Sequence, residues 1–213
     1  MSITLYEAPM SSAVPVVHAL LELGVKFERV TFDLAAKDQK KPDFLKINPN
    51  GKVPALVSDG TPMFEALAIV QWLGDRYGVD KKLWPAADSP ERMTAMAWST
   101  WAYVTFGPAI YRLRLATNPE LPKEMRSEAH ANDARRDLSA MLTVLEGHLA
   151  SRDYILGKEH TLADIIVGDT VTWGTYVGAP VSDFPRVRAW LERVHARDSY
   201  KKAWAMPSAP PAA

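Results

Sequence analysis

Apolar and polar positions along the first eighty residues follow two different periods. In residues 12–23 apolar side chains recur at three- and four-residue intervals, which is typical of a helix packed on one face, and Gly24 ends it. In residues 27–32 apolar and polar side chains alternate, which is typical of a half-buried strand. Over the whole segment the pattern predicts a strand at 3–6, a helix at 12–23, a strand at 27–32 and a helical turn with a loop at 40–51. Two short strands at 53–58 and 61–64 and a helix at 65–78 follow.

After Gly78 the pattern changes. Residues 79–91 contain two prolines and several polar residues, so we expect a linker there. Every later segment is predicted to be helical, with apolar residues at helical spacing over 91–116, 123–150, 162–176 and 185–196. The expected fold is α/β plus all-α: a first domain at residues 1–80, then an all-helical domain at 88–206.

Charge and length narrow the class of partner. Lys and Arg together count 25, as do Asp and Glu, so no global field favours nucleic acid or an anionic membrane. No apolar stretch reaches about 18 residues and the start lacks a basic segment, so neither membrane spanning nor secretion is expected. We therefore expect a cytoplasmic protein whose partners are small molecules or proteins.

The chain contains no cysteine, which excludes disulfides, thiolate metal sites and a cysteine nucleophile. Any thiol chemistry must use a thiol from another molecule. The five histidines are scattered, without the three- to five-residue spacing of a metal-binding helix, so no metal site is expected.

Three short segments carry more specific information. They are NPNGKVPAL at 48–56, FEALAI at 64–69 and YILGKEHTLADI at 154–165. Together with the order of elements, they resemble the glutathione transferase superfamily, in which a thioredoxin-like domain precedes an all-helical domain. The resemblance runs from Ile3 to about Trp204. In the third segment Thr161 is also expected to cap a helix, with Asp164 completing a capping box.

The resemblance implies a glutathione site in the first domain. In the family the bond corresponding to Val53-Pro54 is cis, and the residue before the proline pairs its backbone with the tripeptide as an added strand would. Glu65 would take the α-amino group of the γ-glutamyl residue. Ala66 stands where the family usually has serine, so one hydroxyl donor to the γ-glutamyl carboxylate is missing.

The glycine carboxylate of glutathione would lie against a second group of residues. Lys40 and Lys52 occupy positions at which the family contacts this carboxylate, and Gln39 stands where phi and delta members commonly have histidine. Gln39 could donate a hydrogen bond but brings no charge. The other interpretation of the lysines is that both are solvated surface residues.

Two adjacent serines lie between the first strand and the first helix. The run LYEAPMS resembles the phi-class pattern, which selects Ser11, whereas delta and theta-like patterns select Ser12. If Ser12 is the N-cap, Pro15 falls at the third helical position, where its missing N–H breaks no bond. We therefore expect Ser12 to cap the helix and Ser11 to face a thiol. That both serines only begin the helix stays open.

The expected chemistry is activation of the glutathione thiol. A free thiol has a pKa of about 8.5, and a donor hydroxyl with a helix N-terminus stabilises its thiolate. Glutathione is then a cosubstrate, and the partner a small apolar electrophile between the domains, beside Met10, Tyr103 and Phe106. The reaction subtype stays open among transfer, isomerisation, dehalogenation, ether cleavage and peroxide reduction. The family also implies a homodimer and a role in detoxification.

A non-catalytic binding or assembly module of the same fold is the alternative function. Ala66 and Gln39 favour it, because both depart from the family pattern at the glutathione site. Ser11, the Val53-Pro54 pair and Glu65 favour the enzyme.

Overall fold

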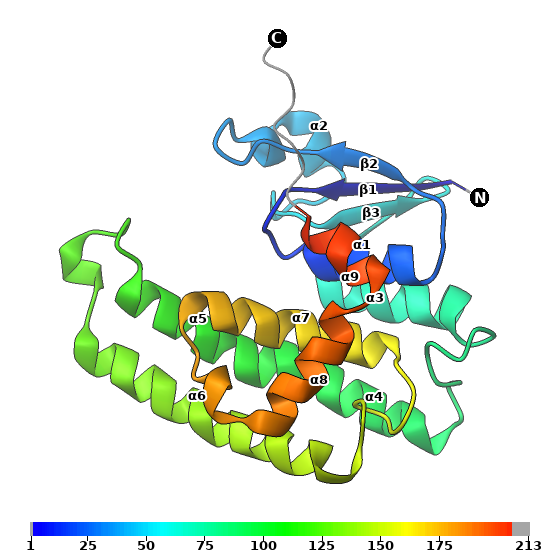
Figure 1. The fold of residues 1–213 in the computed structure, drawn as a ribbon. Helices are drawn as coiled ribbons and strands as arrows, with labels where there is room; N and C mark the ends of the chain where they lie inside the picture. The colour runs from blue at the N-terminus through cyan, green and yellow to red at the C-terminus, as the bar shows by residue number, and fades with distance from the viewer. Residues whose placement is uncertain (1, 206–213) are drawn as a thin grey trace. The chain divides into compact units, whose positions relative to one another are not determined.

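The computed structural model describes residues 2–205, whose contacts divide them into two units (Figure 1). The first unit contains residues 2–84 and 197–205, and the second contains 85–196. The division between the units falls after Trp84, inside the segment expected to be a linker. The expected extent of the helical domain, 88–206, differs at its end, because residues 197–205 pack with the first unit. Residues 1 and 206–213, which include both outer limits of the expected domains, lie outside the described part of the chain.

A four-stranded sheet forms the centre of the first unit. Its strands are β1 (Ile3–Glu7), β2 (Glu28–Thr31), β3 (Ala55–Ser58) and β4 (Thr61–Phe64). The spatial order is β2-β1-β3-β4, with β1 parallel to β2 and the other two pairs antiparallel. The predicted β-α-β-α-β-β-α order is confirmed.

Helices cover both faces of this sheet. The helices are α1 (Val14–Glu22), α2 (Pro42–Leu45), α3 (Ala66–Leu73) and α9 (Asp198–Trp204). Figure 1 shows α2 on one face and α1, α3 and α9 on the other. On the α2 side the rings of Tyr6, Phe32 and Phe44 pack together, with centroids 4.8–5.7 Å apart. On the opposite side Leu5 has no exposed surface. Alternation along β1 therefore supplies apolar side chains to both faces.

Helix α9 was not predicted as an element. Its start is hydrogen-bonded to Glu22, the last residue of α1. Arg197 at its start donates from Nε to the Glu22 carboxylate at 3.0 Å, and the Ser199 hydroxyl donates to the same carboxylate. Ala203 is buried. Because Glu22 and Arg197 are far apart in sequence, local periodicity gives no sign of this contact.

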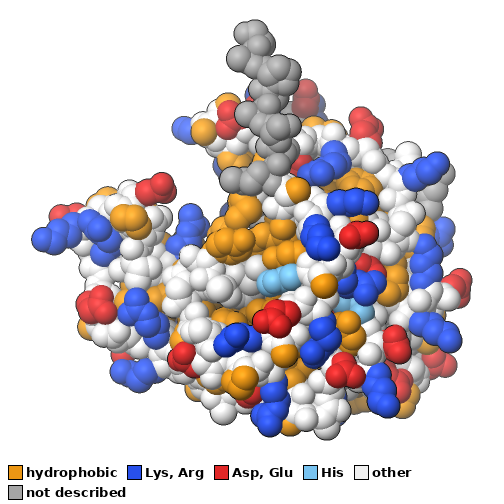
Figure 2. Space-filling model, viewed as in Figure 1, with side chains coloured by type: hydrophobic (Ala, Val, Ile, Leu, Met, Phe, Trp, Pro, Cys, Tyr) orange, Lys and Arg blue, Asp and Glu red, His pale blue; other side chains and the backbone are white. Residues whose placement is uncertain are grey.

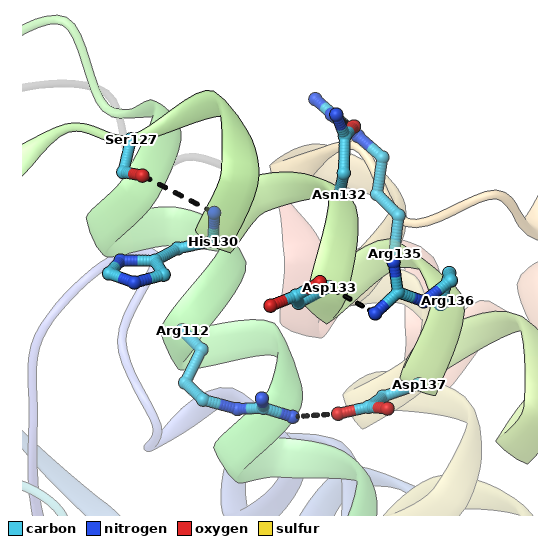
Figure 3. Close-up of polar contacts among 8 residues, drawn as sticks. All are labelled: Arg112, Ser127, His130, Asn132, Asp133, Arg135, Arg136 and Asp137. Carbon is cyan, nitrogen blue, oxygen red and sulfur yellow. Dashed lines mark hydrogen bonds and ion pairs between the residues drawn. The ribbon is translucent and has the colours of Figure 1, made fainter.

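The second unit contains the remaining helices. They are α4 (Pro90–Thr100), a π-helical segment (Trp101–Phe106), α5 (Gly107–Thr117), α6 (Glu128–His148), α7 (Leu162–Val177) and α8 (Pro185–His195). Helix α7 is buried over most of its length, so it forms the core of this unit. Across α5 and α6, Arg112 contacts Asp137 at 2.5 Å, and Ser127 caps α6 through the N–H of His130 (Figure 3). Exposed ion pairs of this kind contribute little stability.

Surface charge is mixed in sign. On the face drawn in Figure 2, Lys and Arg side chains are interspersed with Asp and Glu, as the balanced composition suggests. Within residues 2–205 no helix combines the length and the apolar character needed to cross a membrane.

The capping box at the start of α7 is present as expected. Asp164 has no exposed surface and accepts four hydrogen bonds: from the N–H and hydroxyl of Thr161 at 2.9 and 3.0 Å, from the Ile155 N–H at 2.8 Å and from Trp190 Nε1 at 2.9 Å. Burial raises the pKa of this carboxyl to about 6, and the four hydrogen bonds oppose that rise. One side chain thus joins the start of α7 to the preceding loop and to α8.

Asp164→Asn is expected to lower the free energy of unfolding by about 2–3 kcal/mol at neutral pH, because an amide N–H₂ would then face the Thr161 donors. The folded-state pKa lies above the unfolded value of 3.8, so the folded chain binds the proton more tightly. This stabilising contribution grows as the pH falls below about 6 and is lost as the pH rises through about 6. Urea unfolding should therefore show the difference between wild type and variant widening by roughly 1.4 kcal/mol from pH 7 to pH 5. A constant or narrowing difference would contradict this.

Candidate active site

The register of the sheet brings three loops to one edge. Tyr6 pairs with Ala55 across β1 and β3, and Ala55 pairs with Phe64 across β3 and β4. The chain leaving β1, the chain entering β3 and the chain leaving β4 therefore begin side by side. These three loops contain the two serines, the Val53-Pro54 bond and Glu65 with Ala66.

The expectation that Ser12 caps the first helix is wrong. Helix α1 begins at Val14 with Ala13 as its N-cap and no side-chain cap, and Pro15 falls within its first two positions. The Ser12 hydroxyl instead donates to the carbonyl of Val53 at 2.9 Å. This partner lies 41 residues away in the sequence, so no local pattern could have predicted it.

Ser11 is held by its own loop. Its hydroxyl donates to the Ala8 carbonyl at 2.6 Å and accepts the N–H of Ala13 at 3.2 Å. The oxygen is thus fixed just before α1, at the helix end where positive potential is greatest. Its hydrogen can turn about the Cβ–Oγ bond without moving the oxygen.

The Val53-Pro54 bond is cis, as expected. The loop before it is organised by Asn48, which is 2% exposed. Asn48 Nδ2 donates to the Lys52 carbonyl at 2.6 Å, and Asn48 Oδ1 accepts the N–H of Asn50 at 3.1 Å. Asn48 was not among the predicted site residues. Its signal was the Asn-Pro-Asn-Gly run, since asparagine commonly bonds to the backbone two residues on.

The residues expected at the glycine carboxylate lie together, but they differ in availability. Lys40 Nζ donates to the Asn50 carbonyl at 3.2 Å, so it is partly committed to the loop. Gly51 has φ +56°, and a Cβ there would lie 2.9 Å from the backbone carbonyl oxygen of Gln39, so both conformation and space require glycine. Lys52 is exposed. Gln39 has a buried Oε1 without a hydrogen-bond partner among residues 2–205.

Glu65 and Ala66 occupy the junction of β4 and α3. Glu65 is exposed and has φ 72° and ψ 112°, a conformation rare for a residue with a side chain. Ala66 is the first residue of α3 and is 3% exposed. Unpaired N–H groups of the first helical turn suit a carboxylate placed beside this junction.

The three residues expected at the electrophile belong to different units. Met10, in the first unit, has φ 50° and lines a small pocket together with Glu7, Arg29 and Trp204. In the second unit Tyr103 is half-buried, while Phe106 has no exposed surface and stacks on Trp101 at 5.1 Å. Phe106 therefore packs in the core and offers no surface to a ligand. No group of three or more His, Asp or Glu side chains within residues 2–205 is arranged to hold a metal ion.

Family models match both parts of the chain. The model of the glutathione S-transferase N-terminal domain matches residues 1–75, and that of the glutathione S-transferase C-terminal domain matches residues 99–198.

Individual relatives agree over nearly the whole length. Glutathione S-transferase 3 of Zea mays is 34% identical over 218 residues, covering 97% of this chain and 95% of the relative. Among solved structures, a glutathione transferase of Burkholderia graminis has a TM-score of 0.87 and 28% identity, covering 98% of this chain and 90% of that one. That structure contains two glutathione molecules per subunit. Glutathione transferase F7 of Populus trichocarpa has a TM-score of 0.83 with 28% identity, covering 94% and 97%.

Proposed function

Because the chain belongs to the glutathione S-transferase family, we propose that it binds glutathione at the sheet edge and transfers the whole glutathionyl group, joined through its sulfur, to a small apolar electrophile. The observation that carries this proposal is the 2.9 Å contact between the Ser12 hydroxyl and the Val53 carbonyl. It places the serine loop against the backbone group that an added peptide strand would use. Hydroxyl donors and the peptide-binding edge therefore occur at one place.

Glutathione would lie along three anchor points. The carbonyl of Val53 would accept the cysteinyl N–H, which displaces the Ser12 hydroxyl. Glu65, exposed beside the start of α3, would take the α-amino group, and the first-turn N–H groups would meet the γ-glutamyl carboxylate. At the other end the exposed Lys52 would supply a positive charge, with Lys40 and Gln39 beside it.

Ser11 is the proposed donor to the thiolate. Its oxygen already accepts the Ala13 N–H, which polarises the hydroxyl and keeps it at the helix end. When the hydrogen turns from the Ala8 carbonyl to the sulfur, the thiolate gains a donor without any movement of the oxygen. The thiol proton leaves to solvent, the sulfur attacks the electrophilic carbon, and the leaving group departs with its bonding electrons. Met10, which lines a small pocket of the first unit, remains a candidate contact for the electrophile.

The second candidate function is a non-catalytic binding or assembly module. Ala66 favours it, because a serine hydroxyl is missing beside the expected γ-glutamyl carboxylate. Gln39 also favours it, because an uncharged amide stands where the family commonly has histidine and brings no charge to the glycine carboxylate.

Titration calorimetry with glutathione on wild type and Ala66→Ser separates these functions. We expect wild type to bind, and the variant to bind about fivefold more tightly, because a hydrogen bond to a carboxylate is stabilising and displacement of a water reduces the gain to about 1 kcal/mol. Absence of heat in both proteins at 10 mM ligand would support the non-catalytic module. Binding in wild type with weaker binding in the variant would show that Ala66 is not beside the carboxylate.

Substitution of each serine distinguishes their roles. Ser11→Ala should lower kcat/KM toward 1-chloro-2,4-dinitrobenzene by about tenfold or more with glutathione affinity within a few fold, because its hydroxyl acts on the sulfur. Ser12→Ala should change kcat little and cost about 1 kcal/mol of stability, because it loses the bond to Val53. Steady-state kinetics and urea unfolding measure both. The opposite pattern would transfer the donor role to Ser12.

A second copy of the chain is the proposed protein partner. Large apolar side chains are exposed along the continuous stretch from α4 to α5, including Met93 (79% exposed), Val104 (67%) and Tyr111 (57%). Large apolar side chains exposed along one helical stretch are a feature of surfaces that bind another protein chain.

Sedimentation at micromolar concentration should give twice the chain mass of 23.6 kDa for wild type. Val104→Glu should shift the protein toward monomer, because a charge would be buried in the interface. Val144→Glu, at a 59% exposed position of α6, is the matched control and should remain dimeric. A monomeric wild type, or equal dissociation of both variants, would refute the interface.

A further inference from the structure

Glu7 is a buried carboxylate that the proposed chemistry does not use. It is the last residue of β1 and is 2% exposed, and on the same face of the strand Ile3 and Leu5 are also buried. An apolar side chain at position 7 would continue that pattern. Burying a charge is costly unless it is paired and hydrogen-bonded, so its partners should indicate what it holds.

The end of β2 supplies those partners. Thr31 Oγ1 donates to Glu7 Oε1 at 2.5 Å, and Arg29 Nη2 lies 3.2 Å from the same oxygen. The backbone of this residue is also held, because the N–H of Phe32 donates to the Glu7 carbonyl at 2.8 Å. Both the side chain and the main chain of Glu7 are therefore bonded to β2 or the residue after it. Glu7 is also the last residue before the serine loop, residues 8–13, which joins β1 to α1.

The loop beyond Glu7 needs such an anchor. Met10 has φ 50°, a left-handed conformation that is unfavourable for a residue with a side chain and persists only where its surroundings impose it. Ala8, directly after Glu7, provides the carbonyl that accepts the Ser11 hydroxyl at 2.6 Å. The position of that carbonyl sets where the Ser11 oxygen lies. A continuous set of contacts therefore runs from β2 through Glu7 and Ala8 to Ser11.

We propose that Glu7 is a positioning residue for thiol activation: it fastens the start of the serine loop to β2 and thereby holds the Ser11 hydroxyl where it can donate to the glutathione thiolate. This inference rests on the proposed function. In this scheme Glu7 contacts neither the tripeptide nor the reacting sulfur, and it acts on the sulfur only through the loop. Its Oε1 accepts from Thr31 and pairs with Arg29, and neither an apolar side chain nor an uncharged amide could form that ion pair.

The direction in which the pKa of the bound glutathione thiol changes distinguishes a positioning role of Glu7 from a simple effect of its charge. In Glu7→Gln, misplacement of Ser11 should raise the pKa of the bound glutathione thiol toward its free value of about 8.5, because the thiolate loses its donor. Removal of a nearby negative charge acting only through its field would instead lower that pKa. The pKa is read from the thiolate ultraviolet absorbance of the complex against pH.

Steady-state kinetics should show the matching loss of activity. We expect Glu7→Gln to lower kcat toward 1-chloro-2,4-dinitrobenzene by about tenfold while KM for glutathione stays within about twofold, because misplacement affects the reacting sulfur rather than the tripeptide frame. Thr31→Val removes only a donor to Glu7 and should act in the same direction with a smaller effect. It also keeps the test open if Glu7→Gln folds poorly. Glu28→Gln is the matched control, because Glu28 bonds to Thr4 across the same strand pair, away from the loop.

Two further experiments test whether Glu7 acts through the Ser11 hydroxyl. Adding Glu7→Gln to Ser11→Ala should cause no further loss of kcat, because both act through one hydroxyl. In the ligand-free protein, amide exchange of Ala13, which donates to Ser11 Oγ, should be about tenfold faster in Glu7→Gln than in wild type.

An unchanged or lowered thiol pKa, additive loss in the double variant, or unchanged Ala13 exchange would each overturn the positioning role. Failure of the proposed function would be seen separately, in wild type, as absence of glutathione binding by calorimetry. The Ala13 exchange would still test the anchor in that case.

Discussion

Tyr6, Ala55 and Phe64 face one another across three adjacent strands, and this row of paired backbone determines where the loops beyond it begin. A shift of one residue in either pairing would move the serine loop away from the Val53 carbonyl and turn every strand side chain to the other face. The aromatic packing against α2 on one face and the buried Leu5 on the other oppose such a shift. The site therefore depends on the sheet register before it depends on any single polar contact.

Each unit also contains a buried carboxylate at the junction of two elements. Asp164 accepts four hydrogen bonds and joins the start of α7 to its preceding loop and to α8. Glu7 accepts from Thr31 and Arg29 and joins the end of β1 to β2. A buried charge satisfied by fixed donors has few alternative arrangements, because any other conformation leaves the charge unpaired. Such groups give rigidity to the segments that follow them.

Local patterns predicted the elements well and the tertiary contacts poorly. The order of strands and helices, the cis bond and the capping box at Thr161 are features of short segments, and each was predicted correctly. Helix α1 begins at Val14 and not at residue 12 as predicted. The hydroxyl of Ser12, the predicted cap, is bonded to Val53, 41 residues away. Helix α9 was missed, and its place in the first unit depends on the distant contact between Arg197 and Glu22. Periodicity could not show that Phe106 faces the core, nor that Glu7 is buried, because a glutamate in a strand is ordinarily expected outside.

The central claim is that glutathione pairs with the Val53 backbone beside the serine loop. A crystal structure of the complex with glutathione tests it most directly. The cysteinyl nitrogen should lie within hydrogen-bond distance of the Val53 carbonyl oxygen, with the Ser12 hydroxyl displaced from it and the sulfur within reach of Ser11 Oγ. A structure in which the tripeptide binds elsewhere, or in which Ser12 keeps its bond to Val53 while the site is filled, would contradict it.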